Sequence, residues 1–464
     1  MRAVETLGTG MEAAEPGIIP VKTRPQWLRG GPRLARLAWL RWRWQITFLF
    51  GGCMIGVAGV VMALGAAAAE RQFARLLAAY PYASLLVTPA GFAWLAWVTR
   101  RFVPNSEGSG IPQAIAARRL WDQNERRRLV SLKIGLGKIL LTLAGLLCGA
   151  SIGREGPTVQ VGASIMFAVG RLSPARQRGL ILAGAAAGIA AAFNTPLAGV
   201  VFAIEEMSRA FDERANTLVI GAIIAAGLVS SAWLGNYTYF GVTAANLGSG
   251  VGWAAVPLCG VAGGLLGGLF SRALVAFATG LPGRFGRACK RHPLLFAAGC
   301  GLAVALCGIA SGNTVFGTGY QHIKAVIDHG AALPLRFGIL KMVATTASSV
   351  AGIPGGLFSP SLAVGGGIGY DIARLLPGAP VSAIVILGMV GYFSGVVQAP
   401  ITAFTIVAEM TADHNMIVPL MATSLIGTAV SRLICSEGVY HILSRNYLPR
   451  GIASTGSAAG VPDR

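Results

Sequence analysis

The sequence predicts an all-α integral membrane protein made of many short, tilted or broken helices, arranged as two repeats of inverted topology. Composition, charge-free stretches and an internal repeat predict this fold class. Of the 464 residues, 54% are hydrophobic and 12% are charged, and the mean hydropathy is +0.63. Soluble domains carry about 25% charged residues, so this composition is that of a protein embedded in a bilayer.

Three stretches contain no Asp, Glu, Lys or Arg: residues 179–204, 215–271 and 375–408. The second is longer than one span of about 20 residues and must cross the membrane more than once. We expect one span at 215–235 and a return at 254–272. The 64 glycines interrupt the apolar segments, and irregular backbone at membrane depth is tolerated only where protein or a water-filled cavity surrounds it.

The net charge of +20 could indicate nucleic-acid binding, but the placement of the basic residues argues against it. They cluster in short segments between apolar runs: Arg24–Arg43, Arg118–Lys133, Arg171–Arg178 and Arg284–Arg291. This pattern is typical of the positive-inside rule and marks those segments as cytoplasmic. We expect a multi-pass protein of the inner (plasma) membrane with both termini in the cytoplasm and no nucleic-acid partner.

The sequence repeats itself at a nearly constant offset. Gly184, Pro196 and Glu205 align with Gly388, Pro400 and Glu409 at an offset of 204. The motif Gly153-Arg154-Glu155-Gly156-Pro157 aligns with Gly356-Leu357-Phe358-Ser359-Pro360 at 203, and Gly108-Ser109-Gly110 with Gly317-Thr318-Gly319 at 209. Three motifs in the same order make chance a poor explanation.

The charge pattern also gives the orientation of the two copies. The first half starts inside, after Arg43, whereas the second starts outside, near Trp253. An inverted repeat of this kind places a substrate site near the midplane, at broken helices. We divide the chain into a basic cytoplasmic segment (1–40), one membrane domain (41–450, with halves of about 41–250 and 251–450) and a short tail (451–464).

Three Gly/Pro loops have the composition of an anion site: Gly108-Ser109-Gly110-Ile111-Pro112, Gly153 to Pro157, and Gly355 to Pro360. In each loop glycines precede a proline, and proline is favoured in the first turn of a helix. Unpaired N–H groups and the positive end of the helix dipole then face one point. Ser109 adds a neutral hydroxyl. A site without a full positive charge binds a small anion firmly enough to enter and weakly enough to leave.

Two acidic residues lie in sequence that otherwise resembles bilayer core. Glu155 and Glu206 would each cost about 2.5–3.5 kcal/mol on insertion scales, so such a side chain normally faces a pathway or a partner. Glu205 aligns with Glu409, and we expect that pair to share an architectural role such as capping. Glu155 aligns with Phe358 and Glu206 with Met410, so the repeated scaffold does not require these two acids, and we assign them to function.

These motifs resemble the three signature loops of the CLC chloride channel and transporter family. The resemblance continues through Asn194-Thr195-Pro196-Leu197-Ala198-Gly199 and Glu205-Glu206-Met207 to Tyr440, and covers about residues 40–448. It implies about eighteen helices and a homodimer with a separate ion pathway in each subunit. It is closest to the prokaryotic proton/chloride antiporter type without cytoplasmic regulatory domains, since 24 residues follow Tyr440.

The resemblance also implies roles for individual residues. The implied chloride-binding residues are Ser109, Gly110, Ile111, Glu155, Gly156, Leu357, Phe358 and Tyr440. Glu155 would be the external gate and Glu206 the internal proton relay, near the cytoplasmic face. Arg154 and Lys138 would either shape the potential around the anion or pair with acids. Gln113 and Ile115 stand where family members often carry acids, which puts any accessory proton role there in doubt.

The predicted function is exchange of chloride for protons in the lipid bilayer. Two alternatives stay open: a passive voltage- or pH-gated chloride channel, and an antiporter for fluoride or nitrate. An intramembrane hydrolase with Ser109 as nucleophile would need a base at membrane depth, and none is evident, so we expect no enzyme. We expect no cofactor and no metal, because the five histidines lack metal-ligand spacing; we interpret them as structural or interfacial.

Overall fold

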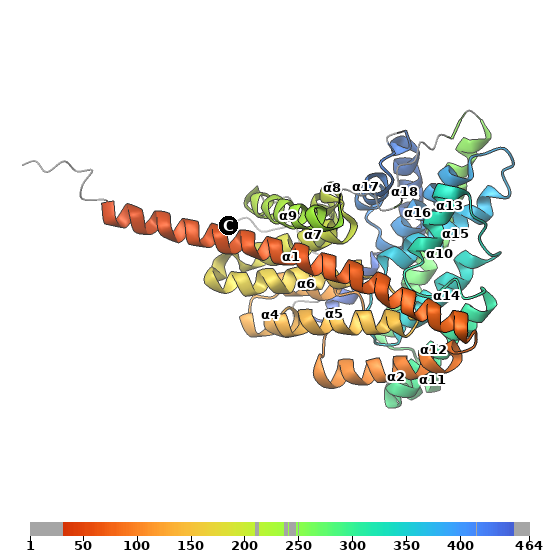
Figure 1. The fold of residues 1–464 in the computed structure, drawn as a ribbon, viewed down its shortest axis with the longest axis horizontal. Coiled ribbons are helices and arrows are strands. Elements are labelled where there is room, and N and C mark those ends of the chain that lie inside the picture. The colour runs from red at the N-terminus through yellow and green to blue at the C-terminus, as the bar shows by residue number, and fades with distance from the viewer. Residues whose placement is uncertain are drawn as a thin grey trace, which may run out of the picture. The chain divides into compact units, whose positions relative to one another are not determined.

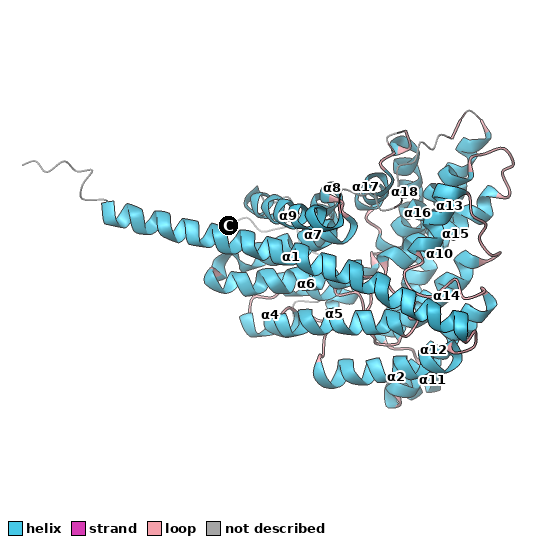
Figure 2. Ribbon diagram, in the orientation of Figure 1, coloured by secondary structure: helices cyan, strands magenta, loops and turns pink. Residues whose placement is uncertain are grey.

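The computed structural model describes residues 31–208, 213–235, 240, 247–248, 250–413 and 415–449. Within these residues the chain is helical and has no named strand (Figures 1 and 2). The expected all-α class is therefore confirmed. The chain divides into two compact units, Met1–Ile46 and Thr47–Arg464. Residues 1–30 and the predicted tail 451–464 lie outside the described residues.

The helices of the first half are α1 (Gly31–Ala79), α2 (Ser84–Phe102), α3 (Ile111–Arg119), α4 (Gln123–Leu129), α5 (Leu132–Leu147), α6 (Glu155–Val169), α7 (Gln177–Phe193), α8 (Pro196–Phe202) and α9 (Glu213–Leu234). Those of the second half are α10 (Val251–Thr279), α11 (Gly283–Arg291), α12 (Pro293–Ala310), α13 (Tyr320–His329), α14 (Phe337–Val350), α15 (Phe358–Ala373), α16 (Val381–Val397), α17 (Pro400–Thr411), α18 (Ile417–Arg432) and α19 (Val439–Arg445). The helices α9 and α10 cover the spans expected at 215–235 and 254–272.

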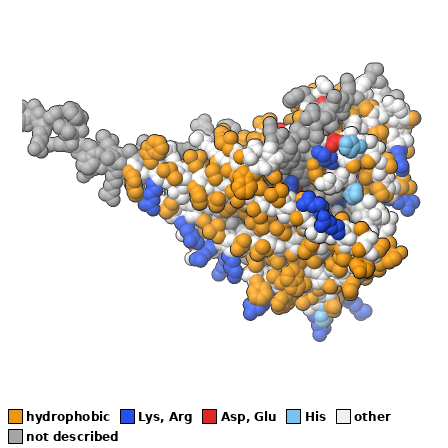
Figure 3. Space-filling model, viewed as in Figure 1, with side chains coloured by type: hydrophobic (Ala, Val, Ile, Leu, Met, Phe, Trp, Pro, Cys, Tyr) orange, Lys and Arg blue, Asp and Glu red, His pale blue; other side chains and the backbone are white. Residues whose placement is uncertain are grey.

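Several helices present apolar surface that suits a lipid environment. Among the described residues, five helical segments are long and apolar enough to cross a membrane: Trp42–Ala79, Gln123–Leu147, Thr217–Leu234, Gly252–Thr279 and Pro293–Ala310. On α5, Leu132, Leu136 and Leu140 are all more than half exposed and lie one turn apart on one face. Hydrophobic side chains cover much of the visible surface; basic side chains lie along its lower and right edges, and further basic side chains lie within the face (Figure 3). A bilayer would cover these apolar side chains.

The two halves are built alike, as the repeat predicts. The helix α6 begins at Glu155 and α15 at Phe358, and each packs on the helix that follows it, α7 and α16. At the first contact a Cβ on Gly162 would overlap the carbonyl of Gly184, and at the second a Cβ on Gly365 would overlap the carbonyl of Gly388. These pairs differ by offsets of 203 and 204. Glycine is needed at both crossings because the helix backbones touch.

The two repeats also exchange carboxylate caps. The Ile401 and Thr402 amides, at the start of α17, donate to the Glu205 carboxylate at 3.1 and 2.6 Å. The Leu197 and Ala198 amides, at the start of α8, donate to Glu409 at 3.0 and 2.6 Å. The first amides of a helix lack intrahelical acceptors, so each glutamate satisfies two orphan donors of the opposite repeat. The architectural role predicted for this pair is capping.

Replacing either capping glutamate by alanine should destabilise the protein by a similar amount. A lost helix cap costs about 1 kcal/mol, and each glutamate serves two amides of equivalent helices. Thermal unfolding of the purified protein in detergent measures the effect, with Glu205→Ala and Glu409→Ala serving as controls for each other. A Tm loss confined to one of the two variants would contradict the shared role.

Candidate functional site

Three helix N-termini are fastened together where the predicted loops meet. The loop before α3 is tied to the loop before α15: Gly108 N donates to Ile353 O and Gly355 N to Gly108 O, both at 3.0 Å. Gly153 and Gly356 exchange two backbone hydrogen bonds of 2.8 Å each. These two glycines are repeat partners, so the bridge joins equivalent positions of the two halves. The positive ends of α3, α6 and α15 are thereby held in one place.

Two buried hydroxyls lie at this junction. Ser109 is 6% exposed and Tyr440, on α19, is 0% exposed. The Ser109 side chain is near enough to interact with the Tyr440 hydroxyl, and the Glu155 and Glu206 carboxylates act on it electrostatically. Neither hydroxyl makes a hydrogen bond of good geometry to a described residue. A buried hydroxyl without a partner loses about 1–3 kcal/mol. A small anion that accepts from both would restore that loss.

Backbone space around Ser109 depends on glycine. A Cβ on Gly156 would overlap the Ser109 hydroxyl. Gly110 has φ of 92°, in the left-handed region that disfavours side chains, and it is the N-cap of α3. Ile111 directly after it is fully buried. The sequence pattern around Ser109 is thus required for the backbone to approach this point.

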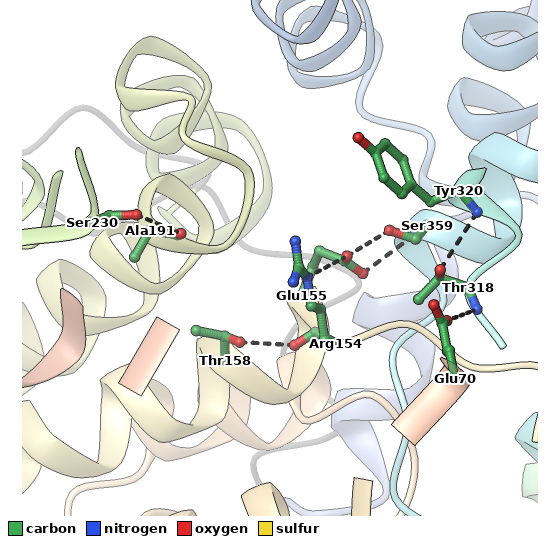
Figure 4. A network of polar contacts seen from close by, with 9 residues as sticks. All are labelled: Glu70, Arg154, Glu155, Thr158, Ala191, Ser230, Thr318, Tyr320 and Ser359. Carbon is green, nitrogen blue, oxygen red and sulfur yellow. Dashed lines mark hydrogen bonds and ion pairs between the residues drawn. The ribbon is translucent and has the colours of Figure 1, made fainter. Parts of the chain in front are cut away.

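Glu155 places its carboxylate at the N-terminus of α15. It is 0% exposed, the Ser359 hydroxyl donates to its Oε1 at 2.5 Å, and the Ser359 amide lies 3.4 Å from its Oε2. Figure 4 shows the two side chains directed at each other. The carboxylate therefore stands where an anion would meet the dipole of α15.

The two cations singled out from the sequence have different surroundings. Arg154 Nε lies 3.8 Å from Glu155 Oε1, so this arginine faces the acid next to it. Lys138 is fully buried, and its Nζ donates to the carbonyls of Ser106 and Gly108 at 2.7 and 2.5 Å. Lys138 therefore holds the Ser109 loop in shape through two carbonyls.

Lys341 is the repeat counterpart of Lys138, at an offset of 203, and our sequence analysis missed it. It is also fully buried, and its Nζ donates to the carbonyls of Val315 and Gly317 at 2.7 Å each. The loop it holds is the counterpart of the Ser109 loop. The repeat offset could have identified it.

Phe358 is the centre of an aromatic cluster at the start of α15. It is fully buried, and its ring packs against Phe193, Phe202, Phe393 and Tyr440 with centroid distances of 6.1, 6.1, 4.8 and 5.8 Å. Leu357, the residue before it, is 4% exposed and is the N-cap of α15. Both halves contribute rings to this cluster, and it holds the Tyr440 ring of α19 beside the start of α15.

Glu206 lies in a π-helical turn, Ala203–Ser208, that continues α8. Its repeat counterpart Met410 lies in α17, which is α-helical through Thr411. Glu206 is 3% exposed, and its Oε1 lies 3.6 Å from His441 Nδ1. Single π-turns within α-helices are frequently found at functional sites. The sequence did not predict this turn or the histidine contact.

A cavity of about 370 Å³ adjoins Glu206. Its lining includes three acids and one base: Glu205, Glu206, Glu437 and Arg432. The polar lining and the volume are sufficient for water. Glu206 thus borders a cavity that could hold water, and water could bring protons to its carboxylate.

Gln113 has a structural explanation. It is 1% exposed, and its Nε2 donates to Glu107 O at 2.7 Å and to the Tyr447 hydroxyl at 3.0 Å. The Tyr447 hydroxyl in turn lies 3.2 Å from Glu107 Oε1. Burial, with the neighbouring Glu107, raises the pKa of Tyr447 well above its usual value, so the phenol stays a neutral donor. The amide closes this network, whereas Ile115 is simply buried core.

Residues 90–432 match the family described as voltage gated chloride channel. The chain belongs to this family. The chain is 31% identical over 425 residues to the "H(+)/Cl(-) exchange transporter ClcA" of Yersinia pseudotuberculosis serotype IB (strain PB1/+), with 85% of this chain and 86% of that protein covered. The family consists of transport proteins, so the chain is not an enzyme.

Two solved structures share this fold. A slow cyanobacterial Cl⁻/H⁺ antiporter superposes with a TM-score of 0.74 at 23% identity, covering 90% of this chain and 99% of that one. A CLC-type fluoride/proton antiporter superposes with a TM-score of 0.69 at 21% identity, covering 88% and 98%. The fold class expected from the sequence is confirmed: the described residues form nineteen α-helices, against about eighteen expected, in two repeated halves.

Replacing Lys138 by methionine should weaken both folding and chloride binding. The carbonyls of Ser106 and Gly108 lose their donor, at about 1–3 kcal/mol, and the loop that carries Ser109 relaxes. The matched control is Lys341→Met, which should lower Tm similarly but leave chloride affinity nearly unchanged. Calorimetric chloride titration and thermal unfolding in detergent measure the two effects. Equal chloride affinities in the two variants would refute the assignment.

Proposed function

We propose that this protein exchanges chloride for protons across the membrane in which it is embedded. The observation that carries the proposal is the Glu155 carboxylate at the N-terminus of α15, beside the buried hydroxyls of Ser109 and Tyr440. A titratable anion occupies a position suited to a transported anion. The name of the 31% identical relative, an H⁺/Cl⁻ exchange transporter, supports the same function.

The proposed anion site consists of neutral donors. Its members are the hydroxyls of Ser109 and Tyr440 and the backbone around Gly110, Ile111, Gly156, Leu357 and Phe358. Helix dipoles at the N-termini supply partial positive charge. The Lys138 Nζ is directed at two loop carbonyls and shapes the loop. Such a site can release a small anion as readily as it binds one.

Protonation of Glu155 links the two ions. The ionised carboxylate accepts from Ser359 and competes with chloride for the same dipole. Chloride nearby disfavours the ionised form, since like charges in one site raise a carboxylate's proton affinity. Binding a proton therefore favours chloride entry, and loss of chloride favours return of the carboxylate. This reciprocal dependence is the minimum requirement for exchange.

Glu206 favours the exchanger over a passive channel. A buried acid that borders a polar cavity can receive a proton without entering the anion path. The scaffold does not require it, because the equivalent position in the second repeat is Met410. A passive voltage- or pH-gated channel has no use for this acid.

Chloride is the anion that the family pattern around Ser109 favours. Fluoride is the second candidate, because one of the solved structures with this fold is that of a CLC-type fluoride/proton antiporter; nitrate is the third. The basic segments support an inner-membrane protein with cytoplasmic termini. The CLC resemblance supports a homodimer, which the detergent-corrected molecular mass of the purified protein measures.

Reversal potentials in liposomes test the proposed function. Purified protein is reconstituted under opposed chloride and proton gradients, and the voltage of zero current is recorded. We expect a value displaced from the chloride equilibrium potential toward that of protons. A value at the chloride equilibrium potential would mean a channel, and repeating the measurement with fluoride or nitrate identifies the preferred anion.

Glu155→Ala should retain chloride flux and lose proton coupling, because the competing carboxylate and its proton site are both removed. Chloride efflux from liposomes and proton uptake driven by a chloride gradient measure the two fluxes. Ser359→Ala is the matched variant: it removes the hydroxyl that holds the carboxylate but leaves the acid. Continued uphill proton movement in Glu155→Ala would sink the gate assignment.

Glu206→Ala should carry chloride with no accompanying proton movement, because the anion site is intact and the internal proton site is gone. The same pair of flux assays measures this result. Met410→Ala changes the equivalent position of the second repeat and should keep coupling. Retained coupling in Glu206→Ala would refute the relay role.

A further inference from the structure

The imidazole of His441 lies next to the carboxylate of Glu206. Its Nδ1 lies 3.6 Å from Glu206 Oε1, and both side chains are 3–4% exposed. This separation exceeds the usual hydrogen-bond length of about 2.7–3.2 Å, so a small side-chain adjustment would bring the atoms into contact. Catalytic hydrogen bonds are often long in the resting state of a site. The pair is therefore one small side-chain movement away from the contact that proton exchange needs, and it is too buried to be a surface ion pair.

The elements around His441 contribute no competing carboxylate among the residues described. Its helix, α19, packs on α3, α10 and α16. The charged or titratable residues of these helices are Arg118, Arg119, Cys259, Arg272 and Tyr392, together with Tyr440 and Arg445 on α19 itself. The Arg118 guanidinium donates to Met207 O at 2.7 Å, and Arg445 pairs with Glu437 at 2.6 Å. Glu206 is thus the acid that faces the imidazole.

We propose that His441 is a further proton-transfer residue of this site, which holds the transported proton jointly with Glu206. Cavity water protonates the Glu206 carboxylate, and the proton passes from Oε1 to Nδ1, which leaves an imidazolium beside an ionised carboxylate. The reverse step returns the proton to Glu206. The proton is conserved, and no other reactant is needed. This inference rests on the proposed exchange of chloride for protons.

The position of His441 also connects the proton site with the anion site. His441 directly follows Tyr440, whose hydroxyl lies at the anion junction. Successive residues of a helix point about 100° apart, so one turn of α19 presents a hydroxyl to the anion and an imidazole to the internal acid. A proton bound to His441 therefore places a charge one residue away from Tyr440, on the same helix.

Asparagine separates proton transfer from structural support. The amide of Asn places a hydrogen-bond donor close to the position of Nδ1, but it cannot take up a proton. A structural role should therefore survive His441→Asn, whereas a proton-transfer role should not. The control is His329→Asn, at an exposed histidine on α13. Both variants are compared with the full-length wild type in liposomes.

We expect His441→Asn to keep chloride flux and to reduce coupled proton flux by at least about tenfold, since a positioned acid–base group contributes roughly 10²–10⁴-fold. The proton-to-chloride ratio should also lose its dependence on internal pH, while Glu206→Gln/His441→Asn should be no worse than Glu206→Gln alone. His329→Asn should match the wild type.

Wild-type coupling and pH dependence in His441→Asn would overturn the proposal. Loss of chloride flux in both His441→Asn and His441→Gln would also count against it, because it would reveal a structural role. Failure of the proposed function is distinguishable: the wild type itself would then show no coupled proton flux. Failure of the His441 assignment leaves wild-type coupling intact.

Discussion

Unpaired backbone groups at the broken helices are the constraint on which this structure depends. A helix that ends inside a membrane leaves amides and carbonyls that lipid cannot satisfy. The chain satisfies them with pairs of groups from opposite repeats: Glu205 and Glu409 cap each other's short helices, and Gly153 and Gly356 bond reciprocally. The donors left over at α3 and α15 are then available to an anion.

The buried lysines follow from the same constraint. Left-handed glycines at Gly108 and Gly317, with φ of 64° and 63°, turn loop carbonyls inward, where water is scarce. Lys138 and Lys341 each donate to two of these carbonyls. Because both lysine Nζ groups are engaged this way, the proposed anion site is left with hydroxyls and amides as its donors. The proposed weak binding of the anion thus depends on the lysine–carbonyl hydrogen bonds that hold the loops.

The internal repeat made much of this arrangement predictable, because its offset identified the capping pair, the three loops and the two acids that break the symmetry. An offset says which positions are equivalent and not which positions touch, so it could not show that each glutamate caps the opposite repeat. The π-turn at Ala203–Ser208 left no sequence signal, since α17 stays α-helical with a similar composition. His441 resembled any interfacial histidine, because Glu206 is far away in the sequence and the packing of α19 brings the two together.

Two of the departures from symmetry lie at the positions for which we propose transport roles. At the caps, bridges, glycine crossings and lysines, both repeats carry the same residue type, because each half must close its own broken helices. At the proposed anion gate one half has Glu155 and the other Phe358; at the proposed proton site one has Glu206 and the other Met410. In the proposed exchange, acids confined to one half define a single proton route. The residues shared by both repeats therefore stabilise the fold, and the two acids found in one repeat alone are those that we propose to carry protons.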